Sequence, residues 1–115
     1  MNLVKGKKGE ELALNYLREK QFQLVCRNFR CRVGEIDLIM LDQEILVFVE
    51  VKSRKNQKYG LPREAVTLTK QRKMRQVALF FLQRNGLYKQ KCRFDVVEIY
   101  LDVNPERANH ISNAF

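Results

Sequence analysis

The sequence predicts a mixed α/β or α+β domain over residues 1–115, with the element order α-β-β-β-α-β. Two segments carry apolar residues at helical spacing, and four other runs are rich in β-branched and aromatic residues. No internal repeat and no linker rich in Pro, Gly or Ser divides the 115 residues. A chain of this length suits one hydrophobic core, so a single domain is expected.

The first helix is predicted over residues 6–20. Leu12, Ala13, Tyr16 and Leu17 recur at the spacing of one helical face, which makes the helix amphipathic. Glu10 precedes Ala13 by three residues and Leu17 by seven. The Glu10 carboxylate is therefore expected at the edge of the buried stripe.

Three strands are predicted over residues 22–29, 34–41 and 45–51. The short polar segment 42–44 suits a hairpin between the last two of them. This hairpin would place Asp37 on the strand next to Glu50.

Alternation of side chains along each strand sorts the charged residues by face. Glu35, Asp37 and Ile39 are predicted to share one face of their strand. Glu50 and Lys52, two residues apart, are predicted to leave the next strand on the same side.

A second helix is predicted over residues 68–85, with Gly86 as its C-terminal stop. Lys70 and Gln71 precede Met74 by four and three residues, so they extend the apolar stripe and can point inward. Residues 91–102 are predicted to form the last strand. The apolar stripe of the helix consists of Met74, Val77, Ala78, Phe81 and Leu82.

The charge of the chain favours a polyanionic partner. Lys and Arg number 22 against 13 Asp and Glu, a formal net charge of +9, which suits nucleic acid. The charge is uneven, because residues 33–51 hold five acidic and no basic residues, whereas residues 52–76 hold nine basic and one acidic. A binding patch alone has no need of an acidic island, so this island calls for a chemical explanation.

Several classes of protein are excluded by the same composition. The longest apolar run, residues 45–51, is too short to span a membrane, and the first residues lack the apolar core of a signal peptide. Three cysteines are an odd number, which argues against a secreted disulfide framework. No helix combines a strongly basic face with a rich apolar face, which disfavours a membrane-surface protein. We expect a cytoplasmic protein without a membrane partner.

Asp37, Glu50 and Lys52 form the candidate site. A carboxylate within a strand of Val, Ile and Phe is costly unless it is paired, hydrated or bound to a metal. Converging carboxylate oxygens suit Mg²⁺ or Mn²⁺, which can activate water and stabilise charge on a phosphate. Glu10 adds a third carboxylate, so the set has a formal charge of −2 that one divalent cation balances. Lys52 would orient the attacking water or neutralise the developing anion.

A structural role for the same residues stays open at this point. Glu50 and Lys52 could form an ion pair on one face of the sheet, and Glu35 and Asp37 could lie on the solvated face of an edge strand. Glu35 could also act as a further metal ligand or orient Arg27 or Arg32.

The remaining candidates divide into a basic surface and a structural set. Three cysteines are expected to be free thiols rather than zinc ligands, and His110 is expected in an exposed tail. Six phenylalanines, at positions 22, 29, 48, 80, 81 and 94, are expected in the core, and Tyr59 is the one aromatic considered for nucleic-acid contact. Residues 53–61 are expected to form a surface loop. The predicted phosphate-binding residues are Arg54, Lys55, Lys58, Arg63, Lys70, Arg72, Lys73 and Arg75.

Several motifs resemble those of the YraN-like family. They are Gly9-Glu10 with the helix that follows, Arg27-Asn-Phe-Arg30, Gly34-Glu-Ile-Asp-Leu-Ile39, Val47-Phe-Val-Glu-Val-Lys-Ser-Arg54, Arg93-Phe-Asp-Val-Val97 and Asn113-Ala-Phe115. The family is similar in turn to archaeal Holliday-junction resolvases and to the PD-(D/E)XK, or restriction-endonuclease-like, superfamily. The resemblance covers nearly the whole chain.

This resemblance implies a restriction-endonuclease-like α/β core, a central mixed sheet flanked by helices. By position, Asp37 matches the Asp of the motif, Glu50 its middle acid and Lys52 its Lys. Glu10 matches the acidic residue that resolvase-like members carry on the first helix. The Pro that precedes the Asp in the superfamily is Ile36 here.

The leading hypothesis is therefore a metal-dependent nuclease that hydrolyses phosphodiester bonds in DNA, with branched or otherwise structured DNA as a candidate substrate. The alternative is a non-catalytic module that uses a nuclease fold to bind nucleic acid or a protein. Resolvase-like relatives act as symmetric dimers, so a homodimer is kept as an open expectation.

Overall fold

Two helices and five strands make up the fold, and the computed structural model describes residues 2–54 and 66–115, with side chains from residue 7 onward. The predicted order α-β-β-β-α-β is confirmed, and one further strand follows it. The elements are α1 (Asn2–Glu19), β1 (Gln23–Cys31), β2 (Gly34–Asp42), β3 (Ile45–Arg54), α2 (Leu68–Arg84), β4 (Cys92–Tyr100) and β5 (Arg107–Ile111).

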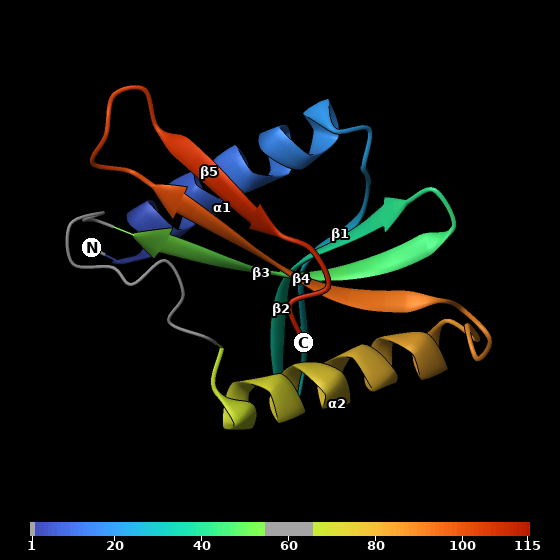
Figure 1. Ribbon diagram of the computed structural model, residues 1–115. Coiled ribbons are helices and arrows are strands. Elements are labelled where there is room, and N and C mark those ends of the chain that lie inside the picture. Colours follow the sequence, from blue (N-terminus) through green and yellow to red (C-terminus); the bar gives the residue numbers. More distant parts are fainter. Residues whose placement is uncertain (1, 55–65) are drawn as a thin grey trace.

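The strands form one mixed sheet in the order β1-β2-β3-β4-β5 (Figure 1). β1, β2 and β3 pair antiparallel in chain order, and β4 pairs antiparallel with β5. β3 and β4 are parallel, and α2 lies in the connection between them. Their register runs without a shift from Leu46↔Cys92 to Arg54↔Tyr100.

The two helices cover opposite faces of this sheet (Figure 1). Burial of an apolar face on each side of the sheet stabilises this three-layer arrangement. The cluster under α1 contains Ala13, Leu14, Leu17, Phe22, Leu38, Met40, Val47, Val49, Val97 and Ile99. The cluster under α2 contains Phe29, Ile36, Ile39, Leu46, Phe48, Met74, Val77, Ala78, Phe81 and Phe94.

Local signals fix the ends of α2 and the turn between β2 and β3. The Thr67 hydroxyl caps α2 by accepting a hydrogen bond from the Lys70 N–H at 3.2 Å. Gly86 follows the helix with φ +65°, a conformation that glycine adopts without strain, so the predicted stop is confirmed. Gln43, in the turn between β2 and β3, also has a positive φ of 55°.

The C-terminal region corrects two expectations. Residues 107–111 form β5, a strand that the sequence pattern did not predict. His110 lies in this strand and not in an exposed tail, because its ring bonds to the buried Asp95 carboxylate and its side chain is only 5% exposed.

The expectation for the phenylalanines holds for most of the set. Five of the six are buried, while Phe80 is half-buried at the edge of the α2-side cluster. The three cysteines are free thiols. In the described residues, no helix has the length and apolarity needed to cross a membrane.

Candidate functional site

The site lies at a fork where β2 and β3 stop pairing. The antiparallel register of β2 and β3 ends at Leu38↔Val49, so Asp37 and Glu50, which would come next, do not pair with each other. The Val51 N–H donates instead to Oδ2 of Asp37 at 2.8 Å. A side-chain carboxylate therefore takes the place of a backbone carbonyl at this position of the ladder.

An interruption in β1 and β2 explains why the strands separate here. Asn28 has φ +50°, a left-handed conformation that Asn tolerates better than most residues. Two residues apart on β2, Ile36 packs in the α2-side cluster but Leu38 packs in the α1-side cluster. Alternation is regular from Leu38 to Leu41 but broken between Ile36 and Leu38, so Glu35 does not share the face of Asp37 and Ile39 as predicted.

Glu10 reaches the same place from α1. Its Oε1 accepts a hydrogen bond at 3.0 Å from Nδ2 of Asn28, a residue of β1. Gly9, the preceding residue, lets the helix lie close to β3, since a Cβ built there would stand 2.3 Å from Ser53 Oγ. The close helix and the left-handed Asn28 together hold the Glu10 carboxylate near Asp37.

Burial is the largest cause of a raised pKa at Asp37, which lies at about 7 instead of the ordinary 3.8. The negative charge of Glu50 raises this pKa further, as do the charge of Glu10 and a hydrogen bond with the Glu50 carboxyl. The Val51 N–H acts in the opposite direction, because it stabilises the carboxylate. The structure thus brings Glu10, Asp37 and Glu50 into one electrostatic group, as the sequence predicted.

Lys70 of α2 contributes a cation to this group. Its Nζ lies 3.6 Å from Oε2 of Glu50, a buried carboxylate at the centre of the sheet. The neighbouring Gln71 points to its own helix start and donates to the Val66 carbonyl at 2.8 Å. Both inward-pointing residues therefore have defined partners, and only Lys70 contacts the site.

Lys52 is half-buried and leaves β3 two residues after Glu50. It makes no hydrogen bond or ion pair with any of the described residues. The suggested ion pair between Glu50 and Lys52 does not form, because Glu50 is paired with Lys70 instead.

Glu35 does not orient Arg27 or Arg32, the two arginines considered as its partners. Its carboxylate pairs with Arg30, its neighbour across the β1–β2 hairpin. Arg27, one of the two predicted partners, pairs with Glu11 of α1 at 3.0 Å.

The donor set suits a divalent cation held by few protein ligands. The described residues contain no group of three His, Cys, Asp or Glu side chains already arranged to hold a metal. Mg²⁺, however, keeps several waters and is commonly bound by one or two carboxylates together with a substrate phosphate. Asp37 and Glu50, with mutual repulsion and hard oxygen donors, fit that chemistry.

The predicted phosphate-binding residues are only partly described. Arg72 and Lys73 are exposed on α2, and the exposed Arg75 lies over the rings of Phe94 and Phe115 at 5.1 and 5.5 Å. Arg54 differs, because it is bonded to Glu98 and its side chain is 21% exposed. Lys55, Lys58, Tyr59 and Arg63, and most of the predicted loop 53–61, lie outside the described residues.

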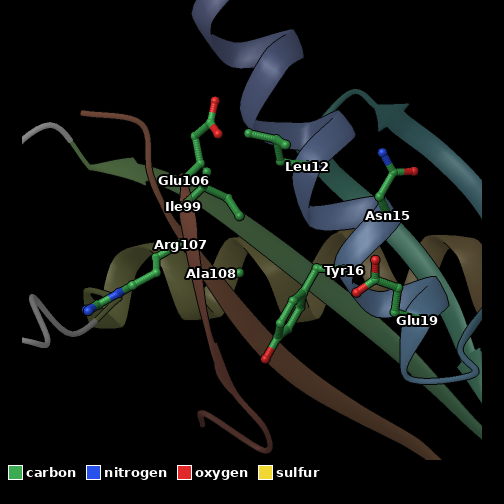
Figure 2. A pocket seen from close by; sticks show the side chains of 8 residues that line it. All are labelled: Leu12, Asn15, Tyr16, Glu19, Ile99, Glu106, Arg107 and Ala108. Atoms are coloured by element: carbon green, nitrogen blue, oxygen red, sulfur yellow. The ribbon is translucent and has the colours of Figure 1, made fainter. Parts of the chain in front are cut away.

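A separate hollow of about 170 Å³ lies between α1 and β5 (Figure 2). Leu12 and Tyr16 line it from α1, and Ala108 lines it from β5. It contains none of the candidate site residues and lies on the α1 side of the sheet.

Comparison with known proteins assigns the chain to a family. A family model described as "Uncharacterised protein family UPF0102" matches residues 9–99, a span that contains Glu10, Asp37, Glu50 and Lys52. A UPF0102 protein of Caldicellulosiruptor saccharolyticus is 46% identical over 96% of this chain and 95% of its own. UPF0102 protein GSU0650 of Geobacter sulfurreducens is 45% identical over 99% and 90%, and UPF0102 protein CD630_12710 of Clostridioides difficile is 44% identical over 99% and 98%. The chain belongs to the UPF0102 family, which is the YraN-like family that its motifs resemble.

Proposed function

We propose that this protein is a metal-dependent nuclease that hydrolyses phosphodiester bonds in DNA. The observation that carries the proposal is the meeting of Asp37 and Glu50 at the fork between β2 and β3. Lys52, two residues after Glu50 on β3, has an ammonium group that pairs with none of the described residues. Two repelling carboxylates in a partly buried site cost stability, and a divalent cation removes this cost.

Each residue of the site has a defined task in this proposal. Asp37 and Glu50 would hold Mg²⁺ or Mn²⁺, and Glu10 would assist from α1. The cation supplies charge stabilisation at the phosphate and eases deprotonation of water. Lys52 would orient the attacking water by hydrogen bonding, and the half-buried setting of its amine strengthens that interaction.

The basic residues near the start of α2 would hold the DNA backbone. Arg72 and Lys73 are exposed on the same helix that brings Lys70 to Glu50, so phosphates bound there would lie along the helix that contacts the site. Lys70 itself would exchange its contact with Glu50 for a phosphate when the cation enters. Such contacts make binding salt-dependent and do not select a sequence.

The test is a cleavage assay with Mn²⁺ on branched, flapped, single-stranded and duplex DNA. Wild type is expected to cut at least one form, and Asp37→Asn, Glu50→Gln and Lys52→Met are each expected to reduce the rate by about 100-fold or more. Glu44→Gln, an exposed carboxylate in the β2–β3 turn, is the matched control and should cut as wild type does.

The alternative, a non-catalytic binding module, gives a different result in the same assay. It binds the DNA forms without cutting any of them, and Glu50→Gln then changes stability or nothing. Cleavage that survives Asp37→Asn and Glu50→Gln unchanged would overturn the proposed site.

A further inference from the structure

A second buried carboxylate lies beside the site on the neighbouring strand. Glu98 of β4 is the register partner of Lys52 of β3 in the parallel ladder. Residues paired in this way project from the same face of a sheet, with strands about 4.8 Å apart. Phe48 and Phe94 pack in the α2-side cluster, which places Lys52 and Glu98 on that side by alternation.

The Glu98 carboxylate is almost completely buried and fully engaged. Its side chain is 2% exposed. Oε2 accepts from Arg54 Nε at 3.3 Å and from Arg54 Nη2 at 3.2 Å, and Oε1 accepts from Asn109 Nδ2 at 2.9 Å. Asn109 belongs to β5, so three strands contribute to this network.

Lys52 thus has two carboxylates as neighbours, and both are already paired with other cations. Glu50 is paired with Lys70, and Glu98 is paired with Arg54. Lys52 is left without an ionic partner among the described residues, although both carboxylates are its neighbours on the same face. Without Arg54, the buried Glu98 would need another cation, and Lys52 is the adjacent one.

We infer that Arg54 is a positioning residue that occupies Glu98 and thereby keeps the Lys52 ammonium available to the Asp37–Glu50 site. This role replaces the phosphate contact expected of Arg54 from the sequence, since its guanidinium faces into the protein. The catalytic consequence rests on the proposed nuclease function, whereas the competition for Lys52 does not. A two-point guanidinium contact suits Arg better than Lys at this position.

Chemical labelling of Lys52 tests the competition directly. The full-length protein is acetylated with an N-hydroxysuccinimide ester, and the rate at Lys52 is measured by peptide mass spectrometry. In Arg54→Met the rate should fall about fivefold, because an ion pair with Glu98 protects the amine. In Arg54→Met/Glu98→Gln it should return to the wild-type value. Lys73, exposed on α2, is the internal standard.

DNA binding and cleavage distinguish positioning from phosphate contact. We expect Arg54→Met to reduce the cleavage rate by about tenfold or more and the double variant to recover most of it. DNA affinity of the double variant should equal that of wild type, whereas Arg72→Met should weaken it. Loss of affinity in the double variant, as in Arg72→Met, would overturn the inference in favour of a phosphate contact.

If Arg54→Met fails to fold, the DNA affinity of Arg54→Met/Glu98→Gln still tests the inference, because this double variant carries no unpaired charge. Unchanged labelling of Lys52 in a folded Arg54→Met, confirmed by its thermal unfolding curve, would also overturn the inference. If wild type cuts no DNA, the proposed nuclease function fails, while the labelling result still decides the role of Arg54.

Discussion

The Val51 N–H donates to the Asp37 carboxylate at 2.8 Å, just past the last backbone pair of β2 and β3. One hydrogen bond therefore joins the two strands at the point where their ladder ends. It holds Asp37 against Glu50 although the two carboxylates repel each other. The geometry of the site is thus a consequence of how the sheet opens, and mutations at this fork give the clearest tests.

Asp37→Asn should make the protein more stable at neutral pH. The pKa of Asp37 is about 7 in the folded protein against an ordinary 3.8, so between these values the folded state binds more protons than the unfolded state. Its contribution to the free energy of unfolding therefore falls as pH rises from about 4 to 7. Asn keeps an acceptor for the Val51 N–H and cannot ionise. The free energy of unfolding of the variant, relative to wild type, should therefore rise by about 1–2 kcal/mol from pH 5 to pH 8.

Urea unfolding of Asp37→Asn and wild type at pH 5 and pH 8 measures this difference. Glu44→Gln, in the exposed turn, serves as the control for loss of one negative charge. A gain in stability that is the same at both pH values would show that ionisation of Asp37 is not its cause.

Lys70→Met should bind Mn²⁺ more tightly than wild type in the absence of DNA. The Lys70 ammonium lies 3.6 Å from Glu50, so it competes with a divalent cation for this carboxylate. Because Lys70 is partly exposed, the gain should be modest, about two- to fivefold in affinity. Calorimetric titration measures it, with Lys73→Met as the control on the same helix. Equal affinities in the two variants would refute the competition.

Asp95→Asn should strongly destabilise the fold. Burial by itself raises the pKa of Asp95, but hydrogen bonds from His110, Arg93 and the Asn113 N–H outweigh it and lower the pKa below its ordinary value. The carboxylate therefore adds stability above the ordinary pKa, and this stability is lost as pH falls through the folded value.

Replacement of the buried Asp95 by Asn leaves the half-buried Arg93 without its main partner and should cost about 2–4 kcal/mol. Asp42→Asn removes only the more exposed contact of Arg93, at 2.9 Å, and should cost less than about 1 kcal/mol. Thermal and urea unfolding compare the two variants. Similar losses in both would mean that Asp95 is not the main anchor.

Gly9→Ala should be stabilising only when Ser53 is also shortened. Alanine favours a helix over glycine by about 1 kcal/mol, but its Cβ would stand 2.3 Å from Ser53 Oγ. The single variant must turn the Ser53 side chain away or shift α1, whereas in Gly9→Ala/Ser53→Ala the nearest remaining atom is 3.7 Å away. A double-mutant cycle by urea unfolding should show positive coupling, and strict additivity would contradict the contact.

The sequence predicts the regular elements well because their apolar periods are strong. Helices α1 and α2 and strands β2 to β4 each bury a continuous stripe or face. β5 lacks this signal, since Arg107, Asn109 and His110 interrupt its five residues. Its stability comes from pairing with β4 and from the bond between His110 and Asp95, which are 15 residues apart in the chain.

The candidate site is likewise predicted from the sequence only in part. Alternation and hairpin pairing bring Asp37, Glu50 and Lys52 together from sequence alone. Alternation could not reveal the fork, because it depends on the left-handed backbone of Asn28 and on a side chain entering the ladder at Asp37. Nor could it assign Arg54 to Glu98, since that pairing requires the parallel register of β3 and β4.

The bond between the Val51 amide and Asp37 also has a practical use. An amide proton held by a carboxylate changes its resonance frequency when that carboxylate gains a proton or a cation, because the acceptor charge changes. The ¹H–¹⁵N signal of Val51 is therefore a reporter within the backbone. It would follow protonation and metal entry at one site without any label on the side chains that perform the chemistry.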